Sequence, residues 1–473
     1  MKEMTNNELK ILEFEKISSR LEELSPATLE NLTELALKYI KEIPTMKSFS
    51  TGEVATSDSL FPAENPVAAS EIASTLRQVF SDLVRSGVNT GSGGFLGYIP
   101  GGGIPMAAVG DFIAALLNRY SGFYQVSPGN THLENEVIKW LVREFDFGPS
   151  AWGTLTSGGT IATLSSLVVV RDQKDITDFS KLTIYMTSQT HSAASRSLKV
   201  AGLARAQVRL IPTGPSYKMD TDFLEKQISE DISKRLVPLV VIGNAGTTNT
   251  GAVDPRRKIS HICKKFKVWF HVDGAYGGFF QLTNEGKKIL DGIGEADSLV
   301  LDPHKSLFMP YGCGAVLFKD GELARKSFTD QAVYLREAHQ SEEKSPANYS
   351  IELTRHSRGP RVWLPLKIFG RDTFSSALEE KLLLAQYLAV ELQKMNGIEL
   401  ACLPELSCVV FRYKDSPHTK KLLENINDSG QVYLTSTQLG ENFYIRACIL
   451  SFRTHKKNIE DLISEIKRFT VNF

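Results

Sequence analysis

The sequence lacks the features that would place the protein in a membrane, on nucleic acid or in an oxidising compartment. No apolar run approaches the roughly 20 residues of a membrane-spanning helix, and the first residues carry mixed charge without a signal-peptide core. The 54 Lys and Arg residues balance 54 Asp and Glu residues, so no overall field favours nucleic acid or anionic lipid. The 5 cysteines show no CxxC or metal-ligand spacing. We therefore expect a soluble, cytoplasmic protein with reduced, mostly buried thiols, no metal, and no membrane or nucleic-acid partner.

Three segments of different pattern divide the 473 residues. Residues 1–87 are predicted to be helical, with two amphipathic helices that break near Ser25-Pro26 and a third over residues 68–86. Helices without a strand bury little core by themselves, so this segment is expected to pack on a partner subunit. Residues 88–369 alternate helices with apolar strands, which predicts a large α/β domain, and residues 370–473 predict a smaller α+β domain.

The predicted strands of the middle segment are mostly continuous apolar runs. Such runs are typical of a mostly parallel sheet that helices cover on both faces. The seven candidates are Trp152–Thr156, Leu182–Thr187, Gln207–Ile211, Leu236–Ile242, Lys267–Val272, Ser298–Leu301 and Gly314–Phe318. The last segment is predicted to contain a helix over 373–395, strands around 399–403, 406–413 and 443–450, and a closing helix over 457–469.

Lys305 stands in an unusual setting for a lysine. It lies within Asp302-Pro303-His304-Lys305-Ser306, directly before an apolar run. A poorly solvated pocket disfavours the ammonium form and so suits a lysine that forms a Schiff base. Asp273, at the end of a predicted strand, is the kind of acid that pairs with a pyridinium nitrogen. Together the two residues predict a pyridoxal phosphate site.

Other candidate site residues also follow predicted strands. The turn Ser157-Gly158-Gly159-Thr160 opens a helix and offers backbone N–H groups and hydroxyls to a phosphate, although alone it equally fits a simple turn. His191 and the loop Gly246-Thr247-Thr248 follow two further strands. The carboxyl ends of such strands form the binding crevice of an α/β sheet, where His191 could stack on an aromatic ring or be only structural.

In this order the motifs resemble the group II pyridoxal-phosphate decarboxylases, which include the aromatic L-amino-acid, glutamate and histidine decarboxylases. The resemblance covers nearly the whole chain and implies the fold-type I, aspartate-aminotransferase-like scaffold and a homodimer with shared active sites. It implies that Lys305 forms the internal aldimine, that Asp273 keeps the pyridine nitrogen protonated, and that His191 and Ala275 flank the ring. The residues implied in phosphate binding are Gly158, Gly159, Thr160, Asp302 and His304, with Thr248 near the ring or the substrate carboxylate.

The resemblance also bears on the reaction and the substrate. Tyr334 matches a loop tyrosine that protonates the substrate Cα in the family, which favours decarboxylation to the amine and CO₂ over aldehyde formation; otherwise it is an exposed loop tyrosine. The implied substrate contacts are Tyr98, Pro100, Tyr120, Phe123 and Arg446, of which Arg446 equally fits a buried structural ion pair. Gly122 stands where relatives carry an aromatic residue, so an aromatic L-amino acid is the first choice and an acidic or other one the alternative. Another fold-type I activity (an aminotransferase or C–C lyase) or a non-catalytic homologue would be the further alternatives.

Overall fold

The computed structural model describes residues 6–19, 24–50, 71–84, 87–174, 176–329 and 343–470. The chain divides into two compact units, Met1–Asn89 and Thr90–Phe473, and each is described by itself. The boundaries expected from the sequence, at 87/88 and 369/370, stay a prediction. No helix among the described residues is both long enough and apolar enough to span a bilayer.

The described residues of the first unit form three α-helices and a small antiparallel ribbon. The helices are α1 (Asn6–Ser18), α2 (Pro26–Glu42) and α3 (Ile72–Val84), and the ribbon pairs β1 (Phe49–Ser50) with β2 (Gly87–Val88). The expected break at Ser25-Pro26 is confirmed: the Ser25 hydroxyl accepts a hydrogen bond from Thr28 N at 3.1 Å, and Pro26 occupies the first turn of α2.

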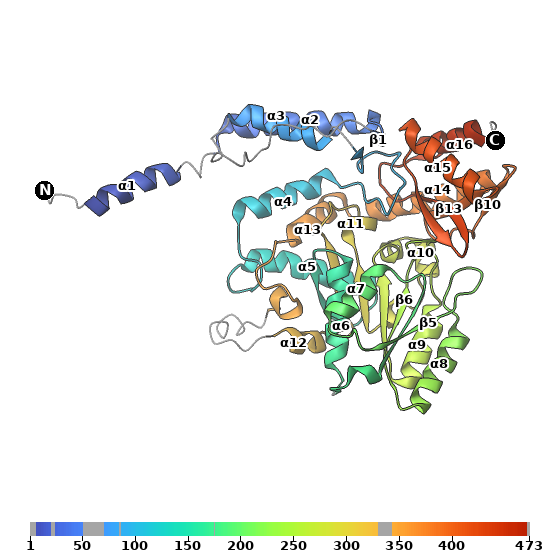
Figure 1. Ribbon diagram of the computed structural model, residues 1–473. Coiled ribbons are helices and arrows are strands. Elements are labelled where there is room, and N and C mark those ends of the chain that lie inside the picture. The colour runs from blue at the N-terminus through green and yellow to red at the C-terminus, as the bar shows by residue number, and fades with distance from the viewer. Residues whose placement is uncertain are drawn as a thin grey trace. The chain divides into compact units, whose positions relative to one another are not determined.

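A seven-stranded sheet forms the centre of the second unit (Figure 1). All seven strands expected from the sequence are present, and their order is β3-β9-β8-β7-β6-β4-β5. Only β9 runs against the others, so the expectation of a mostly parallel sheet is confirmed. Their bounds are β3 (Trp152–Thr156), β4 (Leu182–Thr187), β5 (Gln207–Ile211), β6 (Val237–Asn244), β7 (Trp269–Gly274), β8 (Ser298–Leu301) and β9 (Gly314–Phe318).

Helices cover both faces of this sheet. Apolar residues of α6 and α7 form one buried cluster with strand residues such as Ile184, whereas α8 and α9 contribute to a second cluster on the opposite face with residues such as Val241. Figure 1 shows these two helix pairs on either side of β6. The helices before the C-terminal segment are α4 (Pro105–Leu117), α5 (Pro128–Glu144), α6 (Gly159–Asp172), α7 (Ser192–Val200), α8 (Thr221–Ser233), α9 (Arg256–Phe266), α10 (Asn284–Ile289), α11 (Pro303–Ser306), α12 (Gly321–Phe328) and α13 (Gly359–Phe369).

The C-terminal segment folds as a four-stranded antiparallel sheet, β10-β11-β13-β12, with helices on one face. Its elements are α14 (Arg371–Gln393), β10 (Ile398–Leu400), β11 (Cys408–Tyr413), α15 (Ser416–Ser429), β12 (Thr435–Leu439), β13 (Asn442–Cys448) and α16 (Lys456–Thr470). Side chains alternate between two cores: Val409 packs with the helices, whereas Cys408 and Val410 join the core of the large sheet. One face of the small sheet therefore packs against the core of the seven-stranded sheet.

Candidate active site

The carboxyl ends of five strands meet around one cavity of about 270 Å³. The loops after β3, β4, β6, β7 and β8 each contribute residues to its wall, as expected where parallel strands end at one edge. The structure brings together all ten residues expected to bind a cofactor: Gly158, Gly159, Thr160, His191, Thr248, Asp273, Ala275, Asp302, His304 and Lys305. Asn244 and Tyr276, which the sequence did not single out, also line the cavity.

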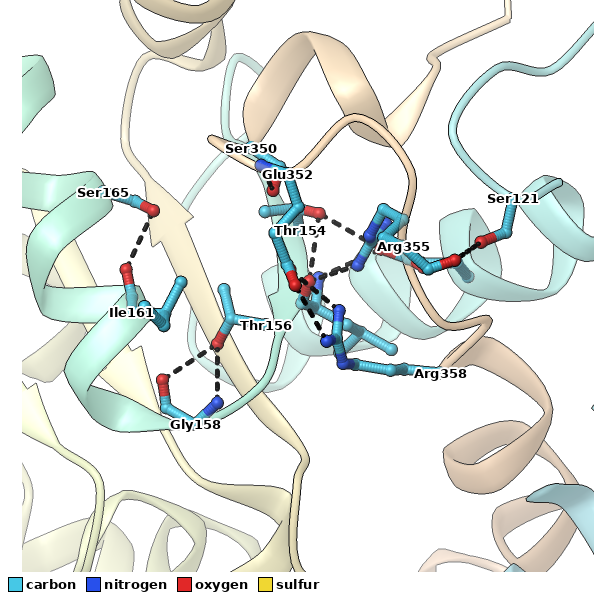
Figure 2. Close-up of polar contacts among 12 residues, drawn as sticks. Ser121, Thr154, Thr156, Gly158, Ile161, Ser165, Ser350, Glu352, Arg355 and Arg358 are labelled. Carbon is cyan, nitrogen blue, oxygen red and sulfur yellow. Dashed lines mark hydrogen bonds and ion pairs between the residues drawn. The ribbon is translucent and has the colours of Figure 1, made fainter. Parts of the chain in front are cut away.

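The turn between β3 and α6 is shaped for an anion. Gly158 has φ +156°, a conformation that favours glycine, and the Thr156 hydroxyl donates to Gly158 O at 3.1 Å (Figure 2). A Cβ on Gly159 would lie 2.9 Å from Asp302 Oδ2, so a side chain there would fill the space between turn and carboxylate. Because α6 begins at Gly159, the backbone N–H groups of its first turn lie at the end of the helix that borders the cavity. A phosphate binds favourably at such a helix N-terminus. These features fit the phosphate of pyridoxal phosphate.

Lys305 is held by an ion pair. Its Nζ lies 2.9 Å from Oδ2 of the buried Asp302 carboxylate, three residues earlier. Burial alone would lower the pKa of Lys305, but the attraction and hydrogen bond from Asp302, with a contribution from Asp273, outweigh burial and raise it. We expected desolvation to favour the neutral amine. The structure instead holds the free lysine as an ammonium, because an acid lies in direct contact with it.

The contacts of Asp302 favour a role different from the phosphate binding that the resemblance implied. A carboxylate has no proton to donate to a phosphate, and its charge repels one. Asp302 Oδ2 accepts from Lys305, and its buried Oδ1 has no hydrogen-bond partner in the part of the chain that the structure describes. We interpret Asp302 as the residue that holds the Lys305 ammonium.

Each of the two cavity histidines has one ring nitrogen committed to the backbone. His304 Nδ1 lies 2.6 Å from Cys313 O, so this nitrogen carries a proton. His191 precedes α7, and its Nδ1 accepts from Ala193 N at 3.2 Å, so the neutral ring carries its proton on Nε2. Burial lowers the pKa of both rings, which favours neutral imidazoles at pH 7. A neutral His191 ring suits stacking on a cofactor ring.

Asp273 is the penultimate residue of β7, and behind it lies a buried polar cluster that the sequence did not reveal. Asp273 Oδ1 accepts from Ala275 N at 3.1 Å. His271, two residues earlier and so on the same face of the strand, is fully buried, with Nδ1 2.8 Å from Ser298 Oγ and 3.0 Å from Ser166 Oγ. Burial lowers the pKa of His271 to about 4. The signal in the sequence was the alternation His271-Val272-Asp273, but the serine partners come from α6 and β8.

The five expected substrate contacts do not line the cavity of their own chain. Tyr120 stacks on Phe123, and its hydroxyl donates to Leu353 O at 3.1 Å. Tyr98 is largely exposed, whereas Arg446 is buried and donates to Asn249 O at 3.0 Å. Tyr98 and Pro100 are likewise outside the lining, and Tyr334 lies outside the described residues. The substrate contacts and the role of Tyr334 stay predictions.

Gly122 lies where no side chain fits in this arrangement. A Cβ there would be 2.7 Å from Leu353 O and 2.9 Å from the Tyr120 ring. The glycine therefore allows the loop that carries Tyr120 to lie close to the backbone at Leu353. This contact gives a structural reason for the departure from the family pattern.

A buried ion pair supports the strand that leads into the phosphate turn. Glu134 of α5 accepts from Arg355 Nη1 at 2.8 Å, from Leu155 N at 3.0 Å and from Thr154 Oγ1 at 3.1 Å. Arg355 also donates to Leu155 O. Nearby, Arg358 makes a bidentate pair with Glu352. The contacts of Glu134 and Arg355 with Thr154 and Leu155 fix the end of β3, and with it the position of Gly158.

A mostly parallel α/β sheet whose strand ends gather a lysine, an aspartate, a histidine and a glycine-rich turn defines a fold-type I pyridoxal-phosphate enzyme. Residues 59–414 match the family model described as the pyridoxal-dependent decarboxylase conserved domain. The chain belongs to this family of pyridoxal-dependent decarboxylases. It is a pyridoxal-phosphate-dependent carboxy-lyase that acts on an amino acid.

Individual relatives cover most of the chain. An aromatic-L-amino-acid decarboxylase of Bacillus atrophaeus is 35% identical over 385 residues, which are 79% of this chain and 80% of the relative. An L-2,4-diaminobutyrate decarboxylase of Acinetobacter baumannii is 25% identical over 391 residues, 76% of each chain. The crystal structure of Catharanthus roseus tryptophan decarboxylase in complex with L-tryptophan has TM-score 0.85 at 24% identity over 100% of both chains, and shows the shared fold.

Proposed function

We propose that the protein decarboxylates an aromatic L-amino acid to its amine, with the cofactor attached to Lys305. The observation that carries the proposal is the convergence of Lys305, Asp273, His191 and the Gly158 turn on one cavity. The aromatic choice is supported by the 35% identity with an aromatic-L-amino-acid decarboxylase. The diaminobutyrate decarboxylase relative makes a basic amino acid the second candidate.

The chain's own residues have distinct parts in this proposal. Pyridoxal phosphate, when bound, withdraws electrons from the bond between the substrate Cα and its carboxylate. Asp273 supplies a fixed negative charge for the protonated ring nitrogen, His191 and Ala275 hold the ring between them, and the Gly158 turn binds the phosphate. Asp302 would hold the ammonium of Lys305 when the lysine is free, and Thr248, which lines the cavity, would contact the ring or the substrate carboxylate. Tyr334 returns a proton to Cα.

A panel assay tests this reaction. Cofactor-loaded protein is incubated with each of the twenty amino acids, DOPA, 5-hydroxytryptophan and 2,4-diaminobutyrate, and CO₂ and amine are measured. We expect equal amounts of CO₂ and amine with an aromatic substrate and no keto acid or aldehyde. Turnover of diaminobutyrate or glutamate alone would contradict the aromatic assignment, and keto acid without CO₂ would contradict decarboxylation.

The anchoring lysine is tested separately from turnover. Borohydride should fix the cofactor to a peptide that contains Lys305, and Lys305→Ala should abolish this covalent labelling. Lys319→Ala is the matched control, because Lys319 is a lysine with a backbone partner, Gly294 O, outside the cavity. Labelling that persists in Lys305→Ala would place the anchor on another lysine.

We further propose a homodimer in which each cavity is completed by the second copy. The apolar face of α4 supports this: Val109, Phe112, Ile113, Leu116 and Leu117 are each more than 40% exposed in the single chain. An apolar face of this extent on one helix is typical of a protein interface. A second copy is also the available source of aromatic contacts, because Tyr120 and Phe123 lie outside the cavity of their own chain.

A substitution on α4 tests the dimer. Leu116→Glu should shift the mass measured by light scattering toward that of one chain and reduce turnover, while the lysine anchor still accepts the cofactor. Leu383→Glu, an exposed apolar residue on α14, is the control and should remain dimeric. A wild-type protein that is monomeric and fully active would contradict the proposal.

The free thiols also support a reducing compartment such as the cytoplasm.

A further inference from the structure

Two cysteines face each other on neighbouring strands of the small sheet. Cys408 of β11 pairs directly with Cys448 of β13 in the antiparallel register. The preceding pair, Ser407 and Ile449, is hydrogen-bonded, with Ile449 N 2.8 Å from Ser407 O. Hydrogen-bonded and non-hydrogen-bonded pairs alternate along an antiparallel ladder, so the two cysteines occupy a non-hydrogen-bonded pair, where Cα atoms are about 4.5 Å apart. This spacing lies within the range of about 4.4–6.8 Å that a disulfide spans.

The surroundings of Cys408 favour a reactive thiolate. Arg446 Nη2 lies 3.8 Å from Cys408 Sγ, and both side chains are buried. The pKa of Cys408 is lowered because the Cys448 thiol hydrogen-bonds to it and Arg446 attracts its charge, whereas burial raises the pKa of Cys448. A thiolate beside a second thiol is the arrangement that gives a disulfide on oxidation.

The other three cysteines lack such an environment. Burial raises the pKa of Cys263, Cys313 and Cys402, and none of the three has a cysteine opposite it in a described strand pair. All five cysteines are among the described residues and all are free thiols in this structure. The Cys408–Cys448 pair therefore differs from the rest in both geometry and charge.

The pair lies next to the active-site cavity. Cys408 Sγ is 4.0 Å from Asn249 O, the same carbonyl oxygen that accepts from Arg446 Nε. Asn249 follows Thr248, which lines the cavity. Cys448 is also near enough to contribute to the raised pKa of Lys305. A small oxidant that enters the cavity thus arrives close to both sulfur atoms.

We propose that Cys408 and Cys448 form a redox modification site, in which a hydroperoxide oxidises the two thiols to a cross-strand disulfide. The Cys408 thiolate attacks one oxygen of hydrogen peroxide, which forms an S–O bond, breaks the O–O bond and releases hydroxide that is protonated to water. The Cys448 sulfur then attacks the Cys408 sulfenic acid, which forms the S–S bond and releases a second water. The two thiols lose two electrons and two protons, and one peroxide is reduced to two waters.

The test uses the full chain with its cofactor and hydrogen peroxide as the oxidant. The thiols that remain free after peroxide treatment are alkylated and counted. We expect their number to fall from five to about three, and treatment with dithiothreitol before alkylation to restore all five. Peptide mapping should use a protease that cleaves after glutamate, because trypsin leaves Cys402 and Cys408 on one peptide and cleavage after Glu405 separates them. The linked peptides should contain Cys408 and Cys448.

Matched variants separate this site from general thiol oxidation. Cys402→Ser removes the more exposed thiol and should keep the Cys408–Cys448 link. Cys448→Ser should abolish the link and leave a Cys408 sulfenic acid that dimedone traps. Oxidation that starts at Cys402, a link between other cysteines, or five free thiols after peroxide treatment would overturn the proposal. Mapping of the wild-type chain decides the question even if Cys448→Ser fails to fold.

Discussion

Replacing Arg355 by Met should destabilise the second unit strongly, because Arg355 and Glu134 form a fully buried pair. Their side chains are 0% and 3% exposed, and the same Glu134 oxygen also accepts from Leu155 N and Thr154 Oγ1. Removing only the arginine leaves a carboxylate in a site that water does not reach, with two neutral donors in place of a cation. The loss should therefore exceed that of an ordinary surface ion pair, which is typically about 1 kcal/mol or less.

The expected size follows from the burial of both charges. Breaking one side of a buried pair costs about 3–5 kcal/mol. The unit Thr90–Phe473 has about 380 residues, for which the unfolding entropy is about 0.8 kcal/mol/K. The Tm of cofactor-free Arg355→Met should accordingly fall by roughly 4–6 °C in a scanning fluorimetry experiment at a fixed heating rate. Affinity for pyridoxal phosphate should fall too, because the pair fixes the strand that ends at the phosphate turn.

Arg358→Met is the matched control. Arg358 also makes a bidentate pair, but its partner Glu352 is 27% exposed and regains water when the arginine is lost. Its Tm should fall by less than half as much. In the double variant Glu134→Gln/Arg355→Met, Tm should fall by less than the sum of the decreases in the two single variants, because no charge remains buried without a partner. An Arg355→Met Tm within about 1 °C of wild type, or equal to that of Arg358→Met, would refute the reasoning.

Two substitutions in the cavity and one at the buried histidine behind it give further tests. Asp273→Asn should retain cofactor colour but lower kcat/KM at least about a hundredfold, because a preorganised charge is lost; near-normal turnover would exclude this role. Asp302→Asn should lower the pKa of Lys305, so the rate of cofactor attachment to the free lysine should reach half its maximum at a lower pH than in wild type; an unchanged midpoint would contradict the ion-pair role. His271 has a pKa of about 4 when folded, below its unfolded value of about 6.5, so the folded state should lose stability as pH falls from about 6.5 toward 4, by about 3 kcal/mol. His271→Asn should flatten this dependence of Tm on pH, and an unchanged slope would mean that other groups cause it.

The strands of the large sheet were predictable because burial on both faces requires continuous apolar runs. Leu182–Thr187 and Val237–Asn244 are buried along almost their whole length, and their sequences have few polar interruptions. β12 was missed because its sequence, Thr-Ser-Thr-Gln-Leu, belongs to an edge strand whose first four residues are half-buried or exposed. An edge strand of this kind carries no apolar signal, and its pairing with β13 is set by tertiary contacts.

The same distinction applies to the site. Residues that chemistry requires at strand ends, such as Lys305 and Asp273, were predictable because parallel strands end at one edge. The Asp302–Lys305 ion pair was not predicted, because the resemblance implied phosphate binding for Asp302, and only the side-chain positions reveal its contact with Lys305. A substrate contact of Arg446 stays a prediction; the sequence did not reveal that its side chain donates to Asn249 O and Thr435 Oγ1, between the small sheet and the cavity loop.

The size of the cavity explains why substrate identity is the hardest property to derive from one chain. At about 270 Å³ the cavity is slightly smaller than most ligand sites, which are about 300–1,000 Å³. Its wall is composed of residues that suit a ring, a phosphate and a lysine anchor, so a substrate side chain must extend beyond it. Tyr120 and Phe123 lie outside that wall, and the apolar face of α4 is exposed and has no cover among the described residues of the second unit. If the second copy supplies that cover, as we propose, then the residues that select the substrate and those that bind the cofactor belong to different chains. Substitutions in the two sets should then affect turnover and cofactor attachment separately.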